Sequence, residues 1–174
     1  MHREALQWVA KIITLNGYDV PGVSVLDLGG RDVNGTTRDL WGKPGRYVVV
    51  DNTPGPGVDF IEDAADFDLA DYQPYDVVTS TECLEHAERA GEIVKTAFRC
   101  LRDGGAFIAT MAGPGRPPHG QHGAPTPAEG EFYRNVEPEQ LNRWIHAAGF
   151  GWWEIDTLGT DLRCHAVKGR GHVA

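Results

Sequence analysis

Two apolar segments, each ending in glycine or an acid, constrain the fold of this chain most strongly. Residues 23–28 run into Gly29 and Gly30, and residues 47–50 end at Asp51. Short apolar runs bounded by turn residues are typical of strands buried on both faces, as in a parallel sheet. We therefore predict two neighbouring parallel strands, with a tight glycine turn after the first and an acid at the end of the second.

The spacing of these two features favours a site for an adenosine-containing cofactor. Gly29 precedes Asp51 by 22 residues, close to the roughly 20 residues between the glycine turn and the ribose-binding acid of one βαβ unit. Because glycine has no Cβ, a ligand can approach this turn closely. A carboxylate at the second strand end can accept hydrogen bonds from both ribose hydroxyls. A dinucleotide is disfavoured because the full G-x-G-x-x-G is absent, although Arg31 can pair with a phosphate, so NADP stays open.

Strand and helix patterns alternate along the rest of the chain. This alternation predicts one α/β domain over residues 1–174, with a doubly wound, mostly parallel sheet of seven strands, an antiparallel edge strand, and helices on both faces. Helices are predicted at 3–15, at 89–101 and from Pro138 with Gly149 as its end, and the region 34–36 is predicted to start a short helix that buries Leu40 and Trp41. Further strands are predicted at 58–61, 76–80, 106–111, 152–158 and 163–167, with a turn at 103–105.

Residues 113–130 interrupt the alternation. The segment holds five prolines and few apolar residues, and it is too long for a simple connector. We expect it to overhang the cleft at the carboxyl edge of the sheet. His119 and His122 lie in it, and a histidine there can act as a general base near neutral pH. The alternative for both is a solvated loop histidine. Their H-x-x-H spacing also fits a metal, but no cysteine or carboxylate pair is near in sequence, so no metal ligands are predicted.

The charge balance narrows the range of partners. The formal net charge of −9 comes from 16 basic and 25 acidic residues, which argues against nucleic acid or an anionic membrane as the main partner. No apolar stretch approaches 18 residues, so no membrane span is expected, and the N-terminus lacks a signal-peptide pattern. Three widely spaced cysteines indicate a reducing compartment, and we expect a cytoplasmic protein. The sequence does not indicate an oligomeric state.

Six short motifs, in order along residues 23–150, resemble those of class I S-adenosylmethionine-dependent methyltransferases. The resemblance implies a Rossmann-like methyltransferase sheet and S-adenosyl-L-methionine as cofactor, with S-adenosyl-L-homocysteine as product. The motifs are Asp27-Leu28-Gly29-Gly30; Val50-Asp51; Glu62-Asp63-Ala64; Tyr75-Asp76-Val77-Val78 with Glu82-Cys83-Leu84-Glu85-His86; Leu101-Arg102-Asp103-Gly104-Gly105; and Glu139 and Leu141 with Ala148-Gly149-Phe150.

The first motif departs from the common pattern, because Arg31 follows Gly30 where a small residue is often found. The stretch Arg31-Asp32-Val33-Asn34-Gly35, together with residues 54–59, Pro-Gly-Pro-Gly-Val-Asp, resembles one subgroup of these enzymes. We interpret the departure as a variant of that subgroup.

The resemblance also implies a set of cofactor-binding residues. Asp27 and Gly29 suit the amino group of the cofactor, Asp51 suits the ribose diol, Asp63 can accept from the adenine amine, and the amide of Ala64 can donate to a ring nitrogen. The alternatives are structural: a strand–helix turn for the glycines, caps for the acids, a helix start at 81–82 and a surface pair at 85–86. The full predicted set is Asp27, Gly29, Gly30, Arg31, Asn34, Asp51, Asn52, Asp63, Ala64, Thr81 and Glu82.

The implied function is transfer of a methyl group to an oxygen, nitrogen or carbon nucleophile. The acceptor is expected to be a small molecule or glycan-type compound, recognised by the N-terminal helix and by residues 113–135. The alternative is a catalytically silent module that binds S-adenosylmethionine and serves in interaction.

Overall fold

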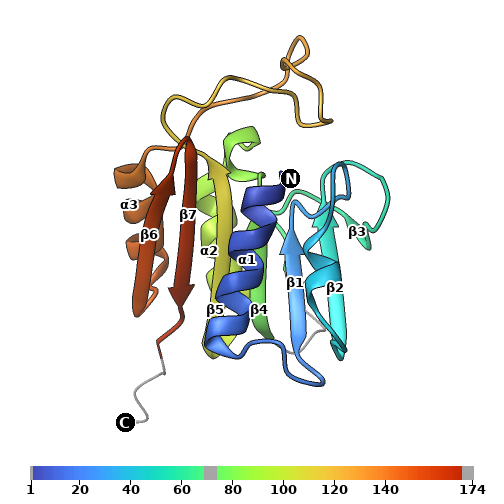
Figure 1. Cartoon of the computed structure of the whole chain (residues 1–174), viewed down its shortest axis with the longest axis vertical. Coiled ribbons are helices and arrows are strands. Elements are labelled where there is room, and N and C mark those ends of the chain that lie inside the picture. The colour runs from blue at the N-terminus through green and yellow to red at the C-terminus, as the bar shows by residue number, and fades with distance from the viewer. Residues whose placement is uncertain (1, 69–73, 170–174) are drawn as a thin grey trace.

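The strands of the computed structural model form one mixed sheet in the order β3-β2-β1-β4-β5-β7-β6 (Figure 1). The structure describes residues 2–68 and 74–169. Strand β7 is antiparallel to β5 and β6, and every other pairing is parallel. The predicted α/β fold is confirmed, and the antiparallel strand lies one place in from the edge. The strands are β1 (Ser24–Leu28), β2 (Arg46–Asp51), β3 (Phe60–Ile61), β4 (Tyr75–Thr81), β5 (Leu101–Ala112), β6 (Trp152–Leu158) and β7 (Asp161–Val167).

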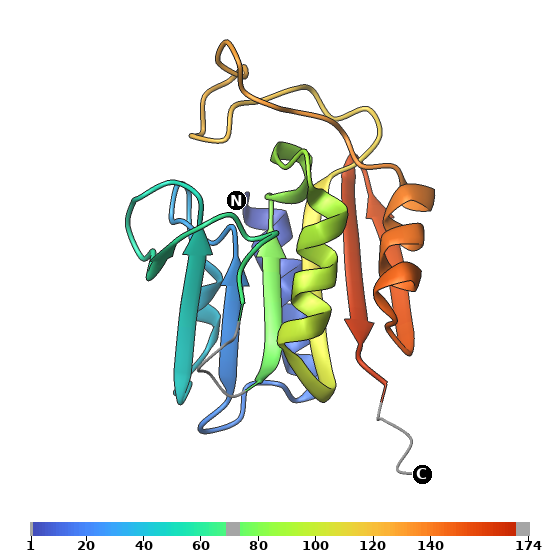
Figure 2. The same ribbon diagram turned by 180° about the vertical axis from the view of Figure 1, so that it is seen from behind.

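Helices cover both faces of this sheet (Figures 1 and 2). Helix α1 (Arg3–Asn16) packs on one face, and α2 (Ala90–Cys100) and α3 (Pro138–Ala148) pack on the other. α1 buries Val9 and Ile13 at helical spacing, against β-branched side chains of β1 and β4. It ends at Gly17, whose φ of 64° is the left-handed conformation that glycine adopts without strain. α1 therefore packs on the sheet.

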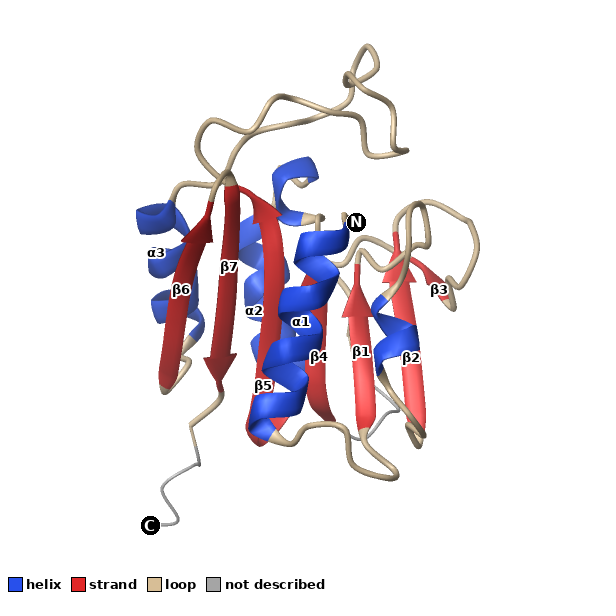
Figure 3. Cartoon of the chain, in the orientation of Figure 1, coloured by secondary structure: helices blue, strands red, loops and turns tan. Residues whose placement is uncertain are grey.

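The parallel strands align their carboxyl ends along one edge. Leu28 pairs with Val50 and Asp27 pairs with Thr79, so the loops that follow β1, β2 and β4 emerge side by side. Two short 3₁₀ helices, η1 (Thr37–Leu40) and η2 (Leu84–His86), lie in the loops after β1 and β4 (Figure 3). This common edge is where α/β sheets bind ligands.

Strand β5 differs from its predicted bounds. It begins at Leu101, and the residues 103–105 predicted as a turn lie within it. Leu101 pairs with Tyr75 and Ala106 with Val77, so β5 bulges against β4. Gly104, with φ of 75°, permits the bulge. β3 is also shorter than predicted, because only Phe60 and Ile61 pair with β2.

The segment from Gly113 to Glu137 has no helix or strand and passes over the carboxyl edge of the sheet (Figures 1 and 2). Backbone hydrogen bonds anchor its return: the Arg134 amide donates to the Glu85 carbonyl at 2.8 Å, and the Val136 amide donates to the Ala112 carbonyl at 2.9 Å. Helix α1 begins near this same edge (Figure 1). Among the described helices, none has the length and apolar character needed to cross a membrane.

Candidate functional site

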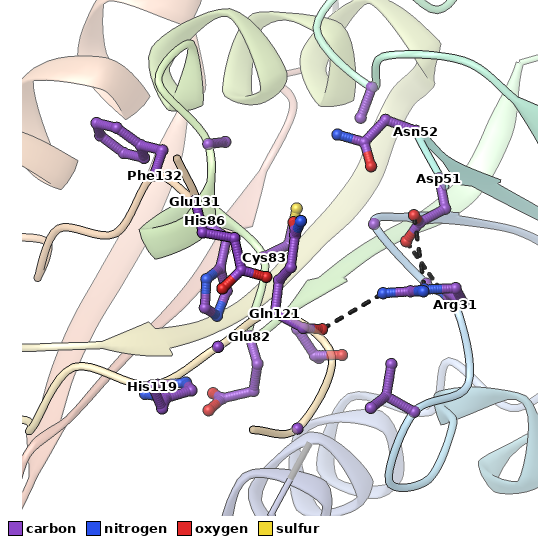
Figure 4. Close-up of a pocket in the computed structure, with 18 of the residues that line it drawn as sticks. Arg31, Asp51, Asn52, Glu82, Cys83, His86, His119, Gln121, Glu131 and Phe132 are labelled. Carbon is purple, nitrogen blue, oxygen red and sulfur yellow. Dashed lines mark hydrogen bonds and ion pairs between the residues drawn. The ribbon is translucent and has the colours of Figure 1, made fainter. Parts of the chain in front are cut away.

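A cavity of about 770 Å³ lies at the carboxyl edge, between the strand ends and the overhanging segment (Figure 4). Its volume falls within the roughly 300–1,000 Å³ of small-molecule sites. The structure brings all of the predicted cofactor-binding residues to its wall, together with His119, but not His122. Those residues are Asp27, Gly29, Gly30, Arg31, Asn34, Asp51, Asn52, Asp63, Ala64, Thr81 and Glu82.

Asp27, in β1, is a buried carboxylate, and one of its oxygens has no hydrogen-bond partner among the described residues. Its Oδ2 accepts hydrogen bonds from Tyr47 at 2.7 Å and from Thr37 at 3.0 Å, while Oδ1 is buried without a hydrogen-bond partner among the described residues. Burial raises the pKa of Asp27, and the hydroxyl donors oppose that rise. A buried acceptor without a partner is costly, so this oxygen is ready for a donor from a ligand.

The two glycines after β1 let this carboxylate and the loop pack closely. A Cβ on Gly30 would lie 2.6 Å from Asp27 Oδ2, and a Cβ on Gly29 would lie 2.7 Å from the Cβ of Cys83. Gly29 also has φ of 73°, which side chains rarely adopt. The turn therefore needs glycine at both positions.

Asp51 ends β2 with its carboxylate oriented by the backbone. Its Oδ2 accepts from the Arg31 amide at 3.2 Å, and its Oδ1 accepts from the Thr53 amide at 3.0 Å. The Arg31 Nε lies 3.9 Å from Asp51 Oδ1. The Arg31 side chain packs over Gly55, where a Cβ would lie 2.6 Å from its Cδ. Figure 4 shows Arg31 and Asp51 facing each other across this part of the cavity.

Asp63 and Ala64 form the wall beyond β3. Asp63 Oδ1 caps the Ala65 amide at 2.8 Å, and its Oδ2 lies 3.4 Å from Arg89. Asp63 thus has the capping role that was its structural alternative, and it also lines the cavity. Cys83 lines the cavity next to Gly29. Burial raises the pKa of its thiol to about 12, so it is a neutral thiol at physiological pH.

Glu82, just after β4, is held in an unusual backbone conformation. Its φ of 52° is the only positive value among the described non-glycine residues, and such strain is typical of functional sites. Thr110 donates to its Oε1 at 3.0 Å, and His2 Nδ1 lies 3.1 Å from its Oε2. Burial favours a higher pKa, but the contacts with His2 and Arg116 hold the pKa of Glu82 below its usual value.

An ion-pair network extends from Glu82 to β7. His2 Nε2 lies 2.7 Å from Asp161 Oδ2, and Arg116 lies 2.5 Å from Asp161 and 3.5 Å from Glu82. The contacts, led by the hydrogen bond with Glu82, raise the pKa of His2. Sequence reasoning missed His2 and Arg116. No local signal marks them, because their partners are 34 to 159 residues away along the chain.

Three aromatic side chains meet at the other end of the cavity. The ring centroids of His86, His119 and Tyr133 are 5.0–5.4 Å apart. Burial lowers the pKa of His86 to about 4, and burial followed by the nearby Glu82 raises the pKa of the fully buried Glu85 to about 8. Glu85 and His86 were weighed as a surface pair, and the structure contradicts this for Glu85. Their position directly after the end of β4 was the available signal.

His122 lies apart from the cavity wall. Its Nδ1 is 2.8 Å from an Arg31 guanidinium nitrogen, and its Nε2 is 3.8 Å from Glu131. Half of its side chain is exposed. Nearby, Gly123 approaches Asn34 so closely that a Cβ there would lie 2.9 Å from the Asn34 amide nitrogen. His122 and Gly123 thus join the overhanging segment to the loop after β1.

The fold and this cavity define an α/β protein of the class that binds its ligand at the carboxyl edge of a doubly wound sheet. A model of the methyltransferase domain family matches residues 1–155. The chain belongs to the methyltransferase domain family, whose members are S-adenosylmethionine-dependent enzymes. The comparison with curated proteins gives no match.

Solved structures of several methyltransferases share the fold. The 1,6-didemethyltoxoflavin-N1-methyltransferase of Burkholderia thailandensis, with bound 1,6-didemethyltoxoflavin and S-adenosylhomocysteine, is 18% identical with a TM-score of 0.68, over 95% of this chain and 78% of that one. The magnesium protoporphyrin IX methyltransferase of Synechocystis PCC 6803, with bound S-adenosylmethionine, is 15% identical with a TM-score of 0.61, over 95% of this chain and 79% of that one.

A phosphoethanolamine N-methyltransferase 2 of Haemonchus contortus is also similar. Its complex with phosphomonomethylethanolamine and S-adenosylhomocysteine is 16% identical with a TM-score of 0.65. The alignment covers 94% of this chain and 53% of that one, so this chain spans about half the length of that enzyme.

Proposed function

We propose that this chain transfers a methyl group from S-adenosylmethionine to a small molecule bound in the 770 Å³ cavity. The observation that carries the proposal is the placement of Asp27, Asp51 and Asp63 at the ends of neighbouring strands around one cavity, with Asp27 Oδ1 buried and unpartnered. The same cavity continues under the overhanging segment, which leaves room for an acceptor.

The residues at the β1–β2 end fit the chemical groups of the cofactor. The free oxygen of Asp27 can accept from a cationic amino group, and the backbone of Gly29 and Gly30 permits its close approach. Asp51, with its carboxylate fixed by two backbone amides, can accept from both ribose hydroxyls. Asp63 can accept from the adenine amine through its Oδ2.

The remaining proposed contacts complete the binding set. Arg31, Asn34 and Asn52 line the cavity beside Asp51, the Ala64 amide can donate to the adenine ring, and Thr81 and Glu82 line the wall at the end of β4.

The chain's own contribution to the reaction is alignment and proton handling. When bound, S-adenosylmethionine supplies an electrophilic methyl group on a sulfonium. Residues that hold the nucleophile in line with that methyl group lower the barrier by pre-organisation. His119 lines the cavity and can take a proton from an acceptor that must lose one. His122 does not line the cavity, so His119 is the stronger candidate for a general base.

The acceptor is proposed to be a small molecule or a glycan-type compound. The net charge of −9 disfavours nucleic acid, and the residues that line the cavity include Glu88, Glu129 and Glu131. By name, the similar enzymes from Burkholderia and Haemonchus act on small molecules. Action as a single domain and a cytoplasmic location belong to the same proposal. The three free cysteines support that location.

Binding of S-adenosylhomocysteine, measured by isothermal titration calorimetry, tests the cofactor assignment. We expect Asp51→Ala to weaken binding by at least about tenfold, because hydrogen bonds to a charged acceptor contribute roughly 1.5–3 kcal/mol. Asp156→Ala is the matched control, since Asp156 is an exposed acid on β6 away from this cavity. Absence of binding to the unaltered protein, or equal affinity in both variants, would contradict the assignment.

A second measurement separates the enzyme from a silent cofactor-binding module. The protein is incubated with methyl-labelled S-adenosylmethionine and fractionated metabolite pools. A labelled small-molecule product that depends on Asp51 is the expected result. Cofactor binding without product from any pool would favour the module.

A further inference from the structure

Glu85 and His86, adjacent residues in η2, each have one buried polar atom without a hydrogen-bond partner among the described residues. Glu85 is fully buried, and its Oε1 accepts from the Ala112 amide at 3.0 Å. Its Oε2 and the Nδ1 of His86 are both buried, and neither has a hydrogen-bond partner among the described residues. Buried polar atoms are rarely left unsatisfied. The pair therefore calls for a group that can bind a carboxylate oxygen and an imidazole nitrogen together.

A third donor faces this pair from the overhanging segment. Ligating atoms of Glu85, His86 and His119 all lie within 4.8 Å of one another. Figure 4 shows His86 and His119 close together at the cavity, on different segments of the chain. We propose that these three residues bind a divalent transition-metal ion, of which Zn²⁺ is the best match for two imidazoles and one carboxylate.

Surrounding contacts orient the donors as metal ligands require. Tyr133 contacts both imidazole rings, at centroid distances of 5.4 Å from His86 and 5.0 Å from His119. His119 Nδ1 lies 3.3 Å from the Pro117 carbonyl, a contact that leaves Nε2 available for a metal. A ligating histidine typically donates its other ring nitrogen in this way. The Ala112 amide fixes the carboxylate of Glu85 similarly.

Binding needs only a small contraction of the cluster. Zinc–nitrogen and zinc–oxygen distances of about 2.0–2.2 Å imply ligand atoms about 3.4 Å apart in a tetrahedral site. His119 lies in a segment without helix or strand, so its side chain can approach η2 without disturbing a regular element. Glu85 and His86 are adjacent in η2.

Three protein ligands leave a fourth position, as in catalytic zinc sites. His86 and His119 both line the cavity, so the open position faces it and can take a water or an acceptor oxygen. Only this last assignment rests on the proposed function, and the metal site itself does not. In this arrangement His119 holds the metal and does not serve as a free base.

Metal binding to the full chain, without a polyhistidine tag and after chelator treatment, tests the proposal. ZnCl₂ is titrated by calorimetry, and CoCl₂ is followed by its visible absorption. We expect one equivalent of metal per chain, with affinity reduced at least about tenfold in Glu85→Gln, His86→Ala and His119→Ala. Glu85→Gln retains an acceptor for the Ala112 amide, so it tests the charge without removing that hydrogen bond.

His122→Ala is the matched control, because His122 lies in the same segment but outside the cluster; its metal affinity is expected to be unchanged. Circular dichroism and S-adenosylhomocysteine affinity verify that each variant is folded. No uptake of either metal by the unaltered protein overturns the proposal, as does equal affinity in all variants. Because zinc is titrated without cofactor, loss of zinc binding and loss of S-adenosylhomocysteine binding are separate results, and each affects only its own proposal.

Discussion

The two ends of the cavity are built from contacts of very different sequence range. At the β1–β2 end, Tyr47 donates to Asp27 and the Arg31 amide donates to Asp51, and both contacts span 20 residues. At the β4–β7 end, His2 contacts Glu82 across 80 residues and Asp161 across 159. The first end is one supersecondary unit. The second forms only when the N-terminus, β4 and the β6–β7 hairpin assemble.

The carboxylates of Asp27, Glu82 and Asp161 also differ in how they are satisfied. Asp27 at the first end keeps a buried oxygen without a partner, whereas Glu82 and Asp161 at the second end are paired with His2 and Arg116. The free oxygen of Asp27 can accept a hydrogen bond from a ligand. Glu82 and Asp161 are instead held in place by ion pairs within the protein, so their positions depend on the whole fold.

The largest effect is expected from the substitution Gly30→Ala at the β1–β2 end. In Gly30→Ala the new Cβ would lie 2.6 Å from Asp27 Oδ2, and Asp27 cannot move without losing the Tyr47 and Thr37 hydrogen bonds. We expect S-adenosylhomocysteine binding to fall below detection in calorimetry. Urea unfolding should give a free energy of unfolding lower by about 1–3 kcal/mol.

Gly42→Ala provides the control for this variant. A Cβ at Gly42 meets its nearest atom, Asp19 Oδ2, at an ordinary 3.4 Å. Its free energy of unfolding and cofactor affinity should stay close to those of the unaltered protein. Cofactor binding retained in Gly30→Ala would show that the turn tolerates a side chain and would remove the contrast between the two ends.

An intermediate, pH-dependent effect is expected at the β4–β7 end. The pKa of folded His2 is raised by Glu82 and then Asp161, so the folded state binds a proton more tightly than the unfolded state. The stabilisation is therefore fully present below about pH 6.5 and is lost as the pH rises through the folded pKa. Because His2 is partly exposed, we expect His2→Ala to cost only about 1 kcal/mol at pH 6 and less at pH 9.

Urea unfolding at both pH values measures this difference, and an NMR titration of the His2 ring reports its pKa directly. Arg116 pairs with both Glu82 and Asp161. These pairs do not need His2, so they limit the decrease in the free energy of unfolding. An equal loss of stability at pH 6 and pH 9 would contradict the linkage.

The smallest effect is expected where the overhanging segment contacts the loop after β1. His122→Ala removes an exposed side chain whose main contact is the Arg31 guanidinium. Its free energy of unfolding should change by no more than about 0.5 kcal/mol, with the same methyl-transfer rate once an acceptor is known. A loss of activity comparable with that of His119→Ala would instead give His122 a part in the reaction.

The sequence predicted the sheet well, because its signals are local. α1 and α3 match the predicted helices within a residue at either end, with Gly17 and Gly149 as their stops. The error at β5 has a physical reason: Gly104 and its neighbours form a bulge inside the strand, and a bulge contains the same residue types as a turn. The gathering of Asp27, Asp51 and Asp63 was predictable because parallel strands end at one edge.

The succession of strands and helices along the chain, the glycine turn after β1 and the acids at the strand ends all follow from local sequence patterns. These depend on backbone conformation and on burial over a few neighbouring residues. Only the folded structure shows that His2 contacts Glu82 and Asp161. It also brings His119 to Glu85 and His86, and it places His122 outside the cavity lining. Such contacts depend on the positions of the 113–137 segment and of His2, which are set by packing across the whole sheet. Packing of this kind does not produce a periodic pattern in the sequence.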